Sequence, residues 1–258
     1  MIDKKAEDNA RVRGDDIIAG RNAVSEALKA GRTIDSLYVA RGNHGGPLSV
    51  LIAKAKKAGA VIKEADPRKL DTLCGNANHQ GVVAIAAVRE FSQMEDIFAL
   101  AEERGEAPFL ILCDELEDPH NLGAIIRSAL LCGAHGVVIP KRGGAAVTPT
   151  VLKSSAGAAA RLPVARVANI GESIRRLKEQ GVFVYCADMD GQPLEKADLT
   201  GPVALVLGSE GKGVSPLVRK LCDGAVSLSM AGRGTGVDSF NVSVAAGIIL
   251  YEIARQRR

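Results

Sequence analysis

The chain has 258 residues, of which 47% are apolar and 24% are charged, and its formal net charge is +3. This length and apolar content suffice for one large or two modest globular domains, each with its own core. Residues 1–16 are charged, and no segment approaches the about 18 consecutive apolar residues of a membrane-spanning helix. We therefore expect a cytoplasmic globular protein with neither an export signal nor a membrane partner.

The cysteines and histidines predict no metal site. The five cysteines are scattered and form no CxxC pair, and none of the four histidines stands near them at a metal-ligand spacing. We therefore expect a reduced protein that contains no zinc or other metal. The cysteines are Cys74, Cys113, Cys132, Cys186 and Cys222.

Residues 17–89 predict a small α/β domain. One helical pattern, RNAVSEALKAG, ends at Gly31, and a second, PLSVLIAKAKKAG, ends at Gly59. Strand-like apolar runs lie in SLYVA, AVIKEA and GVVAIAAV. We expect residues 1–16 to form a disordered tail before this domain, and residues 90–107 to form a charge-rich, weakly helical linker after it.

The positive charge is concentrated in the N-terminal part. Residues 1–90 carry 15 lysines and arginines against 11 acidic residues, whereas residues 91–258 carry 18 against 19. An excess of this kind permits a polyanionic partner such as nucleic acid. It is also within the range of an ordinary globular domain, so charge alone leaves both interpretations open.

Residues 108–258 predict a second domain with a parallel sheet. Short apolar runs such as FLILC, GVVIP and VALVLG alternate with helical patterns, which is typical of an α/β fold whose sheet is covered on both faces. Ligands of such sheets bind beyond the carboxyl ends of the strands. The loops after Asp114, Leu207 and Met230 are therefore the candidate binding segments.

The first of these loops leads into DPHNLGAIIRSA. We expect Asn121 to cap a helix that begins at Leu122, after an entry set by Pro119. Arg127 would then lie in the second turn, from which its long guanidinium side chain could reach over the loop ends. A solvated helix arginine without a ligand is the alternative for this residue.

The second loop, LGSEGKGVS, contains three glycines after an apolar strand. It does not fit the phosphate-binding pattern GxxxxGK[ST], because Gly213 follows Lys212. The glycines would let the backbone pass close to a flat or bulky ligand, framed by Glu210 and Lys212. A glycine-rich turn without any ligand is the alternative.

The third loop, LSMAGRGTGVDSFNVSVAAG, has the strand, glycine turn and helix of a dinucleotide site. A GxGxxG motif would need a third glycine where Val237 or Ser239 stands, and an acidic residue about 20 positions further on has little room before Arg258. This spacing disfavours a nicotinamide oxidoreductase. The polar groups of Ser239, Asn241 and Ser243 at the start of the last helix indicate recognition of a different ligand.

Together, DPHNLGAIIRSA, VALVLGSEGKGVS and LSMAGRGTGVDSFNVSVAAGIILYE resemble the three ordered motifs of the SpoU (TrmH-like) branch of the SPOUT RNA methyltransferases. IAGRNAVSEAL and HQGVVA resemble the small RNA-binding domain, of the ribosomal-protein type, of enzymes that methylate a guanosine ribose in 23S ribosomal RNA. The resemblance implies an α/β fold with a deep trefoil knot in the C-terminal domain, and a homodimer. It also implies S-adenosylmethionine as the methyl donor and a ribose 2′-hydroxyl of RNA as the acceptor.

Carried over by position, the resemblance places one set of residues around the donor and another around the reacting ribose. The donor-binding residues would be Gly208, Leu228, Met230 and Phe240. The residues facing the ribose would be Arg127, Asn121, Glu210, Ser239 and Asn241. Two features depart from the family pattern: Ser229 stands where a proline is usual, and the loop from Ala231 to Asn241 is about three residues longer than usual. The departures put donor contacts between Gly232 and Asp238 in doubt.

The chemistry favours a stabilising role for Arg127 rather than a role as base. A guanidinium is effectively always protonated, so it can grip a substrate phosphate or a developing alkoxide but cannot accept the hydroxyl proton. Phosphate, water and Glu210 remain open as the final proton acceptor. The alternatives for the whole protein are a tRNA 2′-O-methyltransferase and a non-catalytic RNA-binding or ribosome-assembly protein with the same fold.

The N-terminal domain has one aromatic residue, Tyr38, before Phe91. Base stacking on an aromatic platform is therefore not expected, and RNA recognition would depend on phosphate contacts and RNA shape. The candidate RNA-binding residues are Arg21, Asn22, Lys54 and Lys57. A solvated lysine-rich helix face is the alternative for the two lysines.

Overall fold

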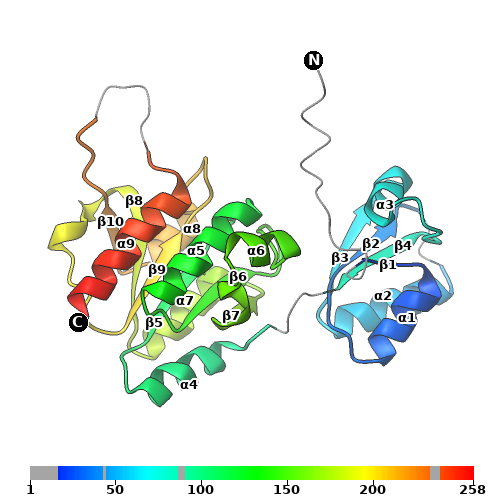
Figure 1. Ribbon diagram of the computed structural model, residues 1–258, viewed down its shortest axis with the longest axis horizontal. Coiled ribbons are helices and arrows are strands. Elements are labelled where there is room, and N and C mark those ends of the chain that lie inside the picture. The colour runs from blue at the N-terminus through cyan, green and yellow to red at the C-terminus, as the bar shows by residue number, and fades with distance from the viewer. Residues whose placement is uncertain (1–16, 43–44, 87–90, 233–238) are drawn as a thin grey trace. The chain divides into compact units, whose positions relative to one another are not determined.

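The computed structural model describes residues 17–42, 45–86, 91–232 and 239–258. The chain divides into two compact units, the first ending at Glu90 and the second beginning at Phe91 (Figure 1). The predicted disordered tail, residues 1–16, lies outside the described residues. Within the described part, no helix combines the length and the apolar character that crossing a bilayer requires.

The first unit is a four-stranded sheet covered on both faces by helices. The strand order is β1-β4-β2-β3, in which β2 and β3 are parallel and the other pairs antiparallel. The strands are β1 (Ile17–Ala19), β2 (Ile34–Ala40), β3 (Val61–Ala65) and β4 (Val82–Ala86), and the helices are α1 (Arg21–Lys29), α2 (Pro47–Lys57) and α3 (Pro67–Cys74). Val24 of α1 and Leu48 of α2 are buried against one face, and Leu70 of α3 is buried against the other.

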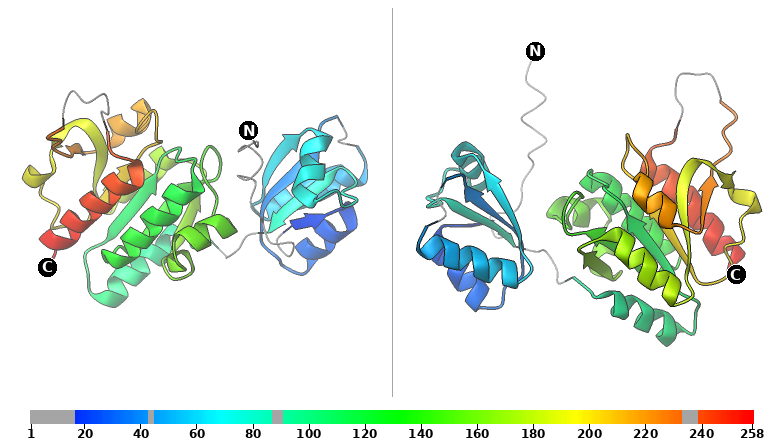
Figure 2. Two further views of the ribbon diagram at one scale, coloured as in Figure 1. Left: turned by 45° about the horizontal axis from the view of Figure 1, so that its top comes forward. Right: turned by 180° about the vertical axis from the view of Figure 1, so that it is seen from behind.

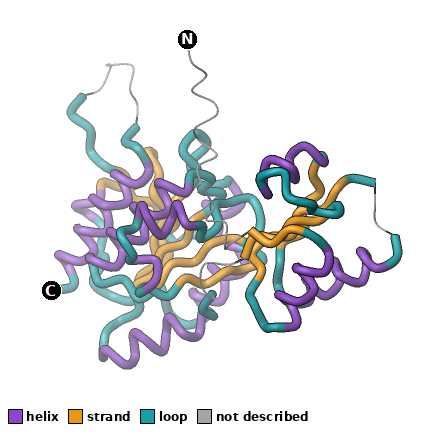
Figure 3. Tube along the Cα trace, turned by 45° about the vertical axis from the view of Figure 1, so that its right-hand side comes forward, coloured by secondary structure: helices purple, strands orange, loops and turns teal. Residues whose placement is uncertain are grey.

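The second unit contains a six-stranded parallel sheet in the order β10-β8-β9-β5-β6-β7. Figure 3 shows strands in orange with helices in purple around them. Its strands are β5 (Phe109–Cys113), β6 (Gly136–Pro140), β7 (Val164–Val167), β8 (Phe183–Pro193), β9 (Val203–Leu207) and β10 (Gly224–Ser227). The parallel α/β architecture expected from the alternation is confirmed, and the trefoil knot stays a prediction. The central strands β5 and β9 are buried at every position because helices cover both faces of the sheet.

The helices of the second unit form a layer on each side of its sheet (Figure 2). They are α4 (Met94–Arg104), α5 (Pro119–Leu131), α6 (Pro149–Ser154), α7 (Ile170–Glu179), α8 (Pro216–Leu221) and α9 (Val242–Gln256), with the short 3-10 turns η2 (Ala158–Ala160) and η3 (Leu194–Lys196). Helices α5, α6 and α9 pack with one set of strand residues, and α4, α7 and α8 pack with the alternating set.

The segment predicted as a linker, residues 90–107, contains helix α4, which belongs to the second unit. Met94 and Ile97 are buried in the core between this helix and the sheet. The helix begins with a capping box in which the carboxylate of Asp96 accepts a hydrogen bond from the backbone N–H of Gln93 at 2.7 Å. The many charges of this segment suggested a linker, but they lie on the exposed face of an amphipathic helix whose other face is buried.

Candidate functional site

A cavity of about 310 Å³ opens at the carboxyl edge of the second unit's sheet. This volume lies at the lower end of the range of about 300–1,000 Å³ that is usual for small-molecule sites. Four segments line it, drawn from residues 187–189, 207–214, 226–230 and 239–249. The first lies within β8, just after the residues of β8 that pair with β9, and the others lie at the ends of β9 and β10 and at the start of α9.

The loop after β9 is closed on itself. Ser209 and Gly213 exchange two backbone hydrogen bonds, each 3.0 Å long. Gly208 lies under this closure, and a Cβ atom there would be 1.9 Å from the carbonyl carbon of Gly213 and 2.1 Å from the nitrogen of Val214. Gly208 is therefore required by the loop's own backbone, a role that its predicted contact with a ligand did not include.

Asp114, at the end of β5, ties this loop to the neighbouring strand. Its backbone N–H donates to the carbonyl of Leu207 at 2.7 Å, and its carboxylate accepts from the backbone N–H of Ser215 at 2.8 Å. The side chain is almost fully buried. The sequence marked Asp114 as the start of a loop but did not identify it as the anchor of the loop 208–215.

Asn121 connects the first loop to the second. Its side-chain amide donates a hydrogen bond of 2.8 Å to the carboxylate of Glu210. The predicted cap role of Asn121 is wrong: helix α5 begins at Pro119, and Asp118 caps it by accepting from the N–H of His120 at 2.8 Å. Proline favours the first helical position, so the helix begins at Pro119 rather than at Leu122. The side chain of Asn121 is then not used as a cap and contacts Glu210 instead.

The cavity brings together six of the nine residues predicted for the donor and ribose sites. They are Gly208, Glu210, Leu228, Met230, Ser239 and Phe240. Asn121 joins the group through Glu210, whereas Arg127 and Asn241 are not among the lining residues. The segment in which donor contacts were in doubt falls largely on residues 233–238, which lie outside the described residues.

Arg127 and Asn241 lie on the outer surface of their helices. Arg127 is exposed in the third turn of α5, one turn later than predicted because the helix starts earlier. It makes no hydrogen bond or ion pair with any described residue. Asn241 is the N-cap of α9, and its side-chain oxygen accepts from the N–H of Ser243 at 2.9 Å.

The site has a second carboxylate that sequence reasoning missed. Asp188, in the second half of β8, lines the cavity and forms an ion pair with Arg219 of α8. Its neighbour Met189 also lines the cavity and is largely exposed.

Burial raises the pKa of the Cys113 thiol to about 12, so the nearby end of β5 offers no thiolate nucleophile. Among the described residues, no cluster of three His, Cys, Asp or Glu side chains is placed to hold a metal ion.

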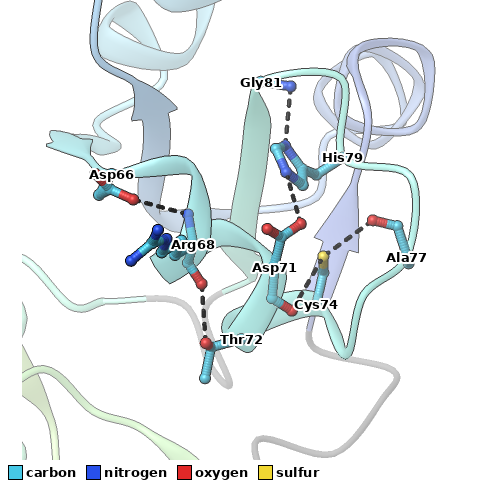
Figure 4. A network of polar contacts seen from close by, with 8 residues as sticks. All are labelled: Asp66, Arg68, Asp71, Thr72, Cys74, Ala77, His79 and Gly81. Carbon is cyan, nitrogen blue, oxygen red and sulfur yellow. Dashed lines mark hydrogen bonds and ion pairs between the residues drawn. The ribbon is translucent and has the colours of Figure 1, made fainter.

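In the first unit, the two sequence stretches AGRNAV and HQGVVA meet at one end of the sheet. The side chain of Arg21 donates to the carbonyl of Gln80 at 3.0 Å, and the side-chain oxygen of Gln80 accepts from the backbone N–H of Arg21 at 3.2 Å. His79 supports this loop, since its Nδ1 accepts from the N–H of Gly81 at 2.9 Å and its Nε2 lies 3.2 Å from the carboxylate of Asp71 (Figure 4).

The four candidate RNA-binding residues do not form one surface. Arg21 and Asn22 follow the C-terminal end of β1, beside Gln80. Helix α2 starts after the C-terminal end of β2 and returns to the N-terminal end of β3, which is parallel to β2. Lys54 and Lys57, in the last turns of α2, therefore lie towards the opposite end of the sheet from Arg21 and Asn22.

Two family models cover most of the chain. Residues 108–251 match the SpoU rRNA Methylase family, and residues 17–92 match the model for RNA 2′-O ribose methyltransferase substrate binding. YacO of Bacillus subtilis (strain 168), assigned to the TrmH family of tRNA/rRNA methyltransferases, is 44% identical over 243 residues, which is 94% of this chain and 96% of that protein. An uncharacterized tRNA/rRNA methyltransferase of Mycobacterium sp. (strain KMS) is 43% identical over 245 residues, with 94% and 77% covered.

Two solved structures have the same fold over nearly the whole chain. The SpoU methyltransferase AviRb from Streptomyces viridochromogenes, in complex with the cofactor AdoMet, gives a TM-score of 0.58 at 28% identity and covers 93% of this chain and 90% of that one. An rRNA methyltransferase from Sinorhizobium meliloti gives a TM-score of 0.55 at 26% identity and covers 98% and 90%. The chain belongs to the SpoU (TrmH-like) family of RNA methyltransferases.

Proposed function

We propose that this RNA methyltransferase transfers a methyl group from S-adenosylmethionine to a ribose 2′-hydroxyl, and that its substrate is a guanosine of 23S ribosomal RNA. The observation that carries the proposal is the cavity lined by all four predicted donor residues and by Glu210. The two-unit chain, with its substrate-binding match at residues 17–92, favours a large structured RNA. The tRNA alternative stays open to test, because the relatives' names cover both tRNA and rRNA.

The cavity fits the chemistry of the donor. Leu228, Val242 and Ile249 give it an apolar wall suited to an adenine ring. We assign contacts with the ring's nitrogen atoms to backbone groups of the loop 208–213, which lines the cavity. The carboxylate of Glu210 suits a ligand that carries positive charge on its sulfonium and ammonium groups, whereas that of Asp188 is already paired with Arg219.

When bound, the donor supplies an activated methyl group on a positively charged sulfur. The residues of this chain must then align the ribose oxygen with that methyl group and stabilise the negative charge that grows on the oxygen as its proton leaves. We assign the stabilising contact to Arg127. Asn121 holds Glu210 through their hydrogen bond, and we assign this cavity-lining carboxylate to the side of the reacting hydroxyl.

Donor titration and RNA mapping test this function. Isothermal titration of the full chain with S-adenosylmethionine is expected to give micromolar binding. Ribosomal RNA from cells with the gene is expected to carry one 2′-O-methylguanosine that is missing from cells without it. Absence of donor binding would favour the non-catalytic RNA-binding protein, and loss of a tRNA modification instead would favour the tRNA enzyme.

We also propose that the protein acts as a homodimer through the outer face of α5 and α9, which pack side by side (Figures 1 and 2). Ile249, Leu250 and Ile253 of α9 are buried in the core. In contrast, Val244, Ile248 and Tyr251 form an exposed apolar stripe on α9, and Leu131 of the neighbouring helix α5 is also exposed. Arg127 precedes Leu131 by one helical turn, so a second copy on this stripe would lie beside Arg127 and help to enclose the reacting ribose.

Replacing Ile248 by glutamate is expected to convert the dimer to the 26.9 kDa monomer and to abolish methylation. The charge would be buried at the interface without a partner, whereas the exposed position tolerates it in the monomer. Sedimentation velocity and a methylation assay measure both effects. The matched control is Leu217→Glu, which adds the same charge at an exposed leucine on the opposite helix layer and should leave the dimer intact. A dimer that persists in the Ile248 variant would contradict the assignment.

A further inference from the structure

Three side chains of the first unit converge on the α3 face of its sheet. Tyr38 of β2 and Lys63 of β3 are register partners, and Lys69 belongs to α3. The Lys63 ammonium lies 5.3 Å from the centre of the Tyr38 ring, and the Lys69 ammonium lies 5.6 Å from it. Lys63 also donates to the Tyr38 hydroxyl at 3.5 Å. The fold therefore places two cations on one aromatic ring from three separate elements.

The Tyr38–Lys63–Lys69 cluster brings two like charges to one aromatic ring. Both lysines are exposed, and within the described residues neither ammonium forms an ion pair with a carboxylate. Lys29 of the same unit, in contrast, pairs with Glu26 at 2.8 Å. Each ammonium adds positive potential around the ring, and anionic groups that contact the two lysines lower the electrostatic energy of this arrangement. The cluster therefore has the charge and the donors of an anion site.

The cluster lies towards the same end of the sheet as the Arg21–Gln80 contact. Tyr38 pairs with Val83 of β4, three residues after Gln80, and Ala40 donates its N–H to the carbonyl of Gly81 at 2.9 Å. Arg21 contacts Gln80 directly. Positive side chains from β1–α1, β3 and α3 thus gather towards one end of this sheet, which gives an extended polyanion more than one point of contact.

We infer that the Tyr38–Lys63–Lys69 cluster binds the phosphodiester backbone of the RNA substrate. The inference rests on the proposed function and assigns a contact surface to its RNA-binding unit. The two ammonium groups and the tyrosine hydroxyl donate to non-bridging oxygens of the RNA's phosphates, while the ring holds each ammonium beside it. Such contacts position the RNA without reading its bases, so they contribute affinity rather than sequence choice.

The test measures binding of the full chain to 23S ribosomal RNA transcribed in vitro, at several salt concentrations. The double variant Lys63→Ala/Lys69→Ala is expected to bind about tenfold more weakly. The slope of log K against log salt concentration is expected to become less negative by about 1 to 2, because each lost phosphate contact removes about 0.9 from its magnitude. Lys29→Ala/Lys56→Ala removes the same number of charges near the opposite end of the sheet and is the matched control. The affinity of this control should stay within about twofold of that of the unaltered chain, and its salt dependence should be unchanged.

The tyrosine provides a second, independent comparison. Tyr38→Leu keeps an apolar side chain against Leu70 but removes the ring, and it is expected to weaken RNA binding several-fold, whereas Tyr38→Phe keeps the ring and should lose less. Thermal unfolding of each variant establishes that it is folded. Unchanged affinity and slope in the Lys63/Lys69 variant, or an equal loss in the Lys29/Lys56 control, would overturn the inference. Failure of the unaltered chain to bind S-adenosylmethionine or RNA would instead reject the proposed function.

Discussion

Replacing Arg127 by alanine is expected to lower kcat for methyl transfer by about a hundred- to a thousandfold, the usual cost of removing one group that stabilises developing negative charge. The side chain is exposed and has no partner among the described residues, so its loss should leave the melting temperature unchanged. Donor affinity should also stay unchanged, because Arg127 does not line the cavity. Single-turnover methylation and calorimetric titration measure these quantities separately.

Arg127→Lys is the conservative control for the same position. Lysine keeps the positive charge but lacks the planar fork that can hold a phosphate or an oxyanion through two hydrogen bonds. We expect an activity between those of the alanine variant and the unaltered chain. If methylation survives in both variants while donor and RNA binding are unchanged, the assignment of Arg127 to the reaction is wrong.

Replacing Gly208 by alanine is expected to lower the affinity for S-adenosylmethionine by about 5- to 150-fold. The added methyl group would meet the backbone of Gly213 and Val214 at distances of 1.9 Å and 2.1 Å, so the loop must open. Overpacking of this kind costs about 1–3 kcal/mol, and 1.4 kcal/mol corresponds to a tenfold change in affinity. Calorimetric titration of the full chain gives the affinity, and circular dichroism tests whether the rest of the fold is intact.

Gly201→Ala provides a matched control outside the cavity. A Cβ atom at Gly201 meets no atom within 4 Å, in contrast to one at Gly208, and Gly201 is not among the residues that line the cavity. We expect this variant to bind the donor with an affinity within about threefold of the unaltered chain. Equal losses at the two positions would contradict the close backbone contact at Gly208 as the cause.

The fold could be predicted to a large extent because the second unit repeats one local signal. Its strands are short, apolar and separated by helical patterns, and this alternation has few solutions other than a covered parallel sheet. Helix α4 was missed as a core element because its buried residues, Met94, Ile97 and Ala101, stand among many charges. Spacing along the helix, rather than composition, carries the signal in such a segment.

The site was predicted in part, and its errors have local causes. The glycine loop after β9 could be identified because glycines, an acidic residue and a strand end occur together in the sequence. Asp188 could not, because β8 continues to Pro193 and nothing in the sequence shows that its second half borders a cavity. The partnership between Asn121 and Glu210 joins residues 89 positions apart, and no local pattern contains it.

The self-closed loop from Ser209 to Gly213 has a thermodynamic consequence for ligand capture. Its two backbone hydrogen bonds and the Asp114 anchor hold this wall of the cavity in shape through contacts internal to the protein. Little conformational entropy then remains to be lost from these residues when a small molecule arrives, so more of the interaction energy is retained as affinity.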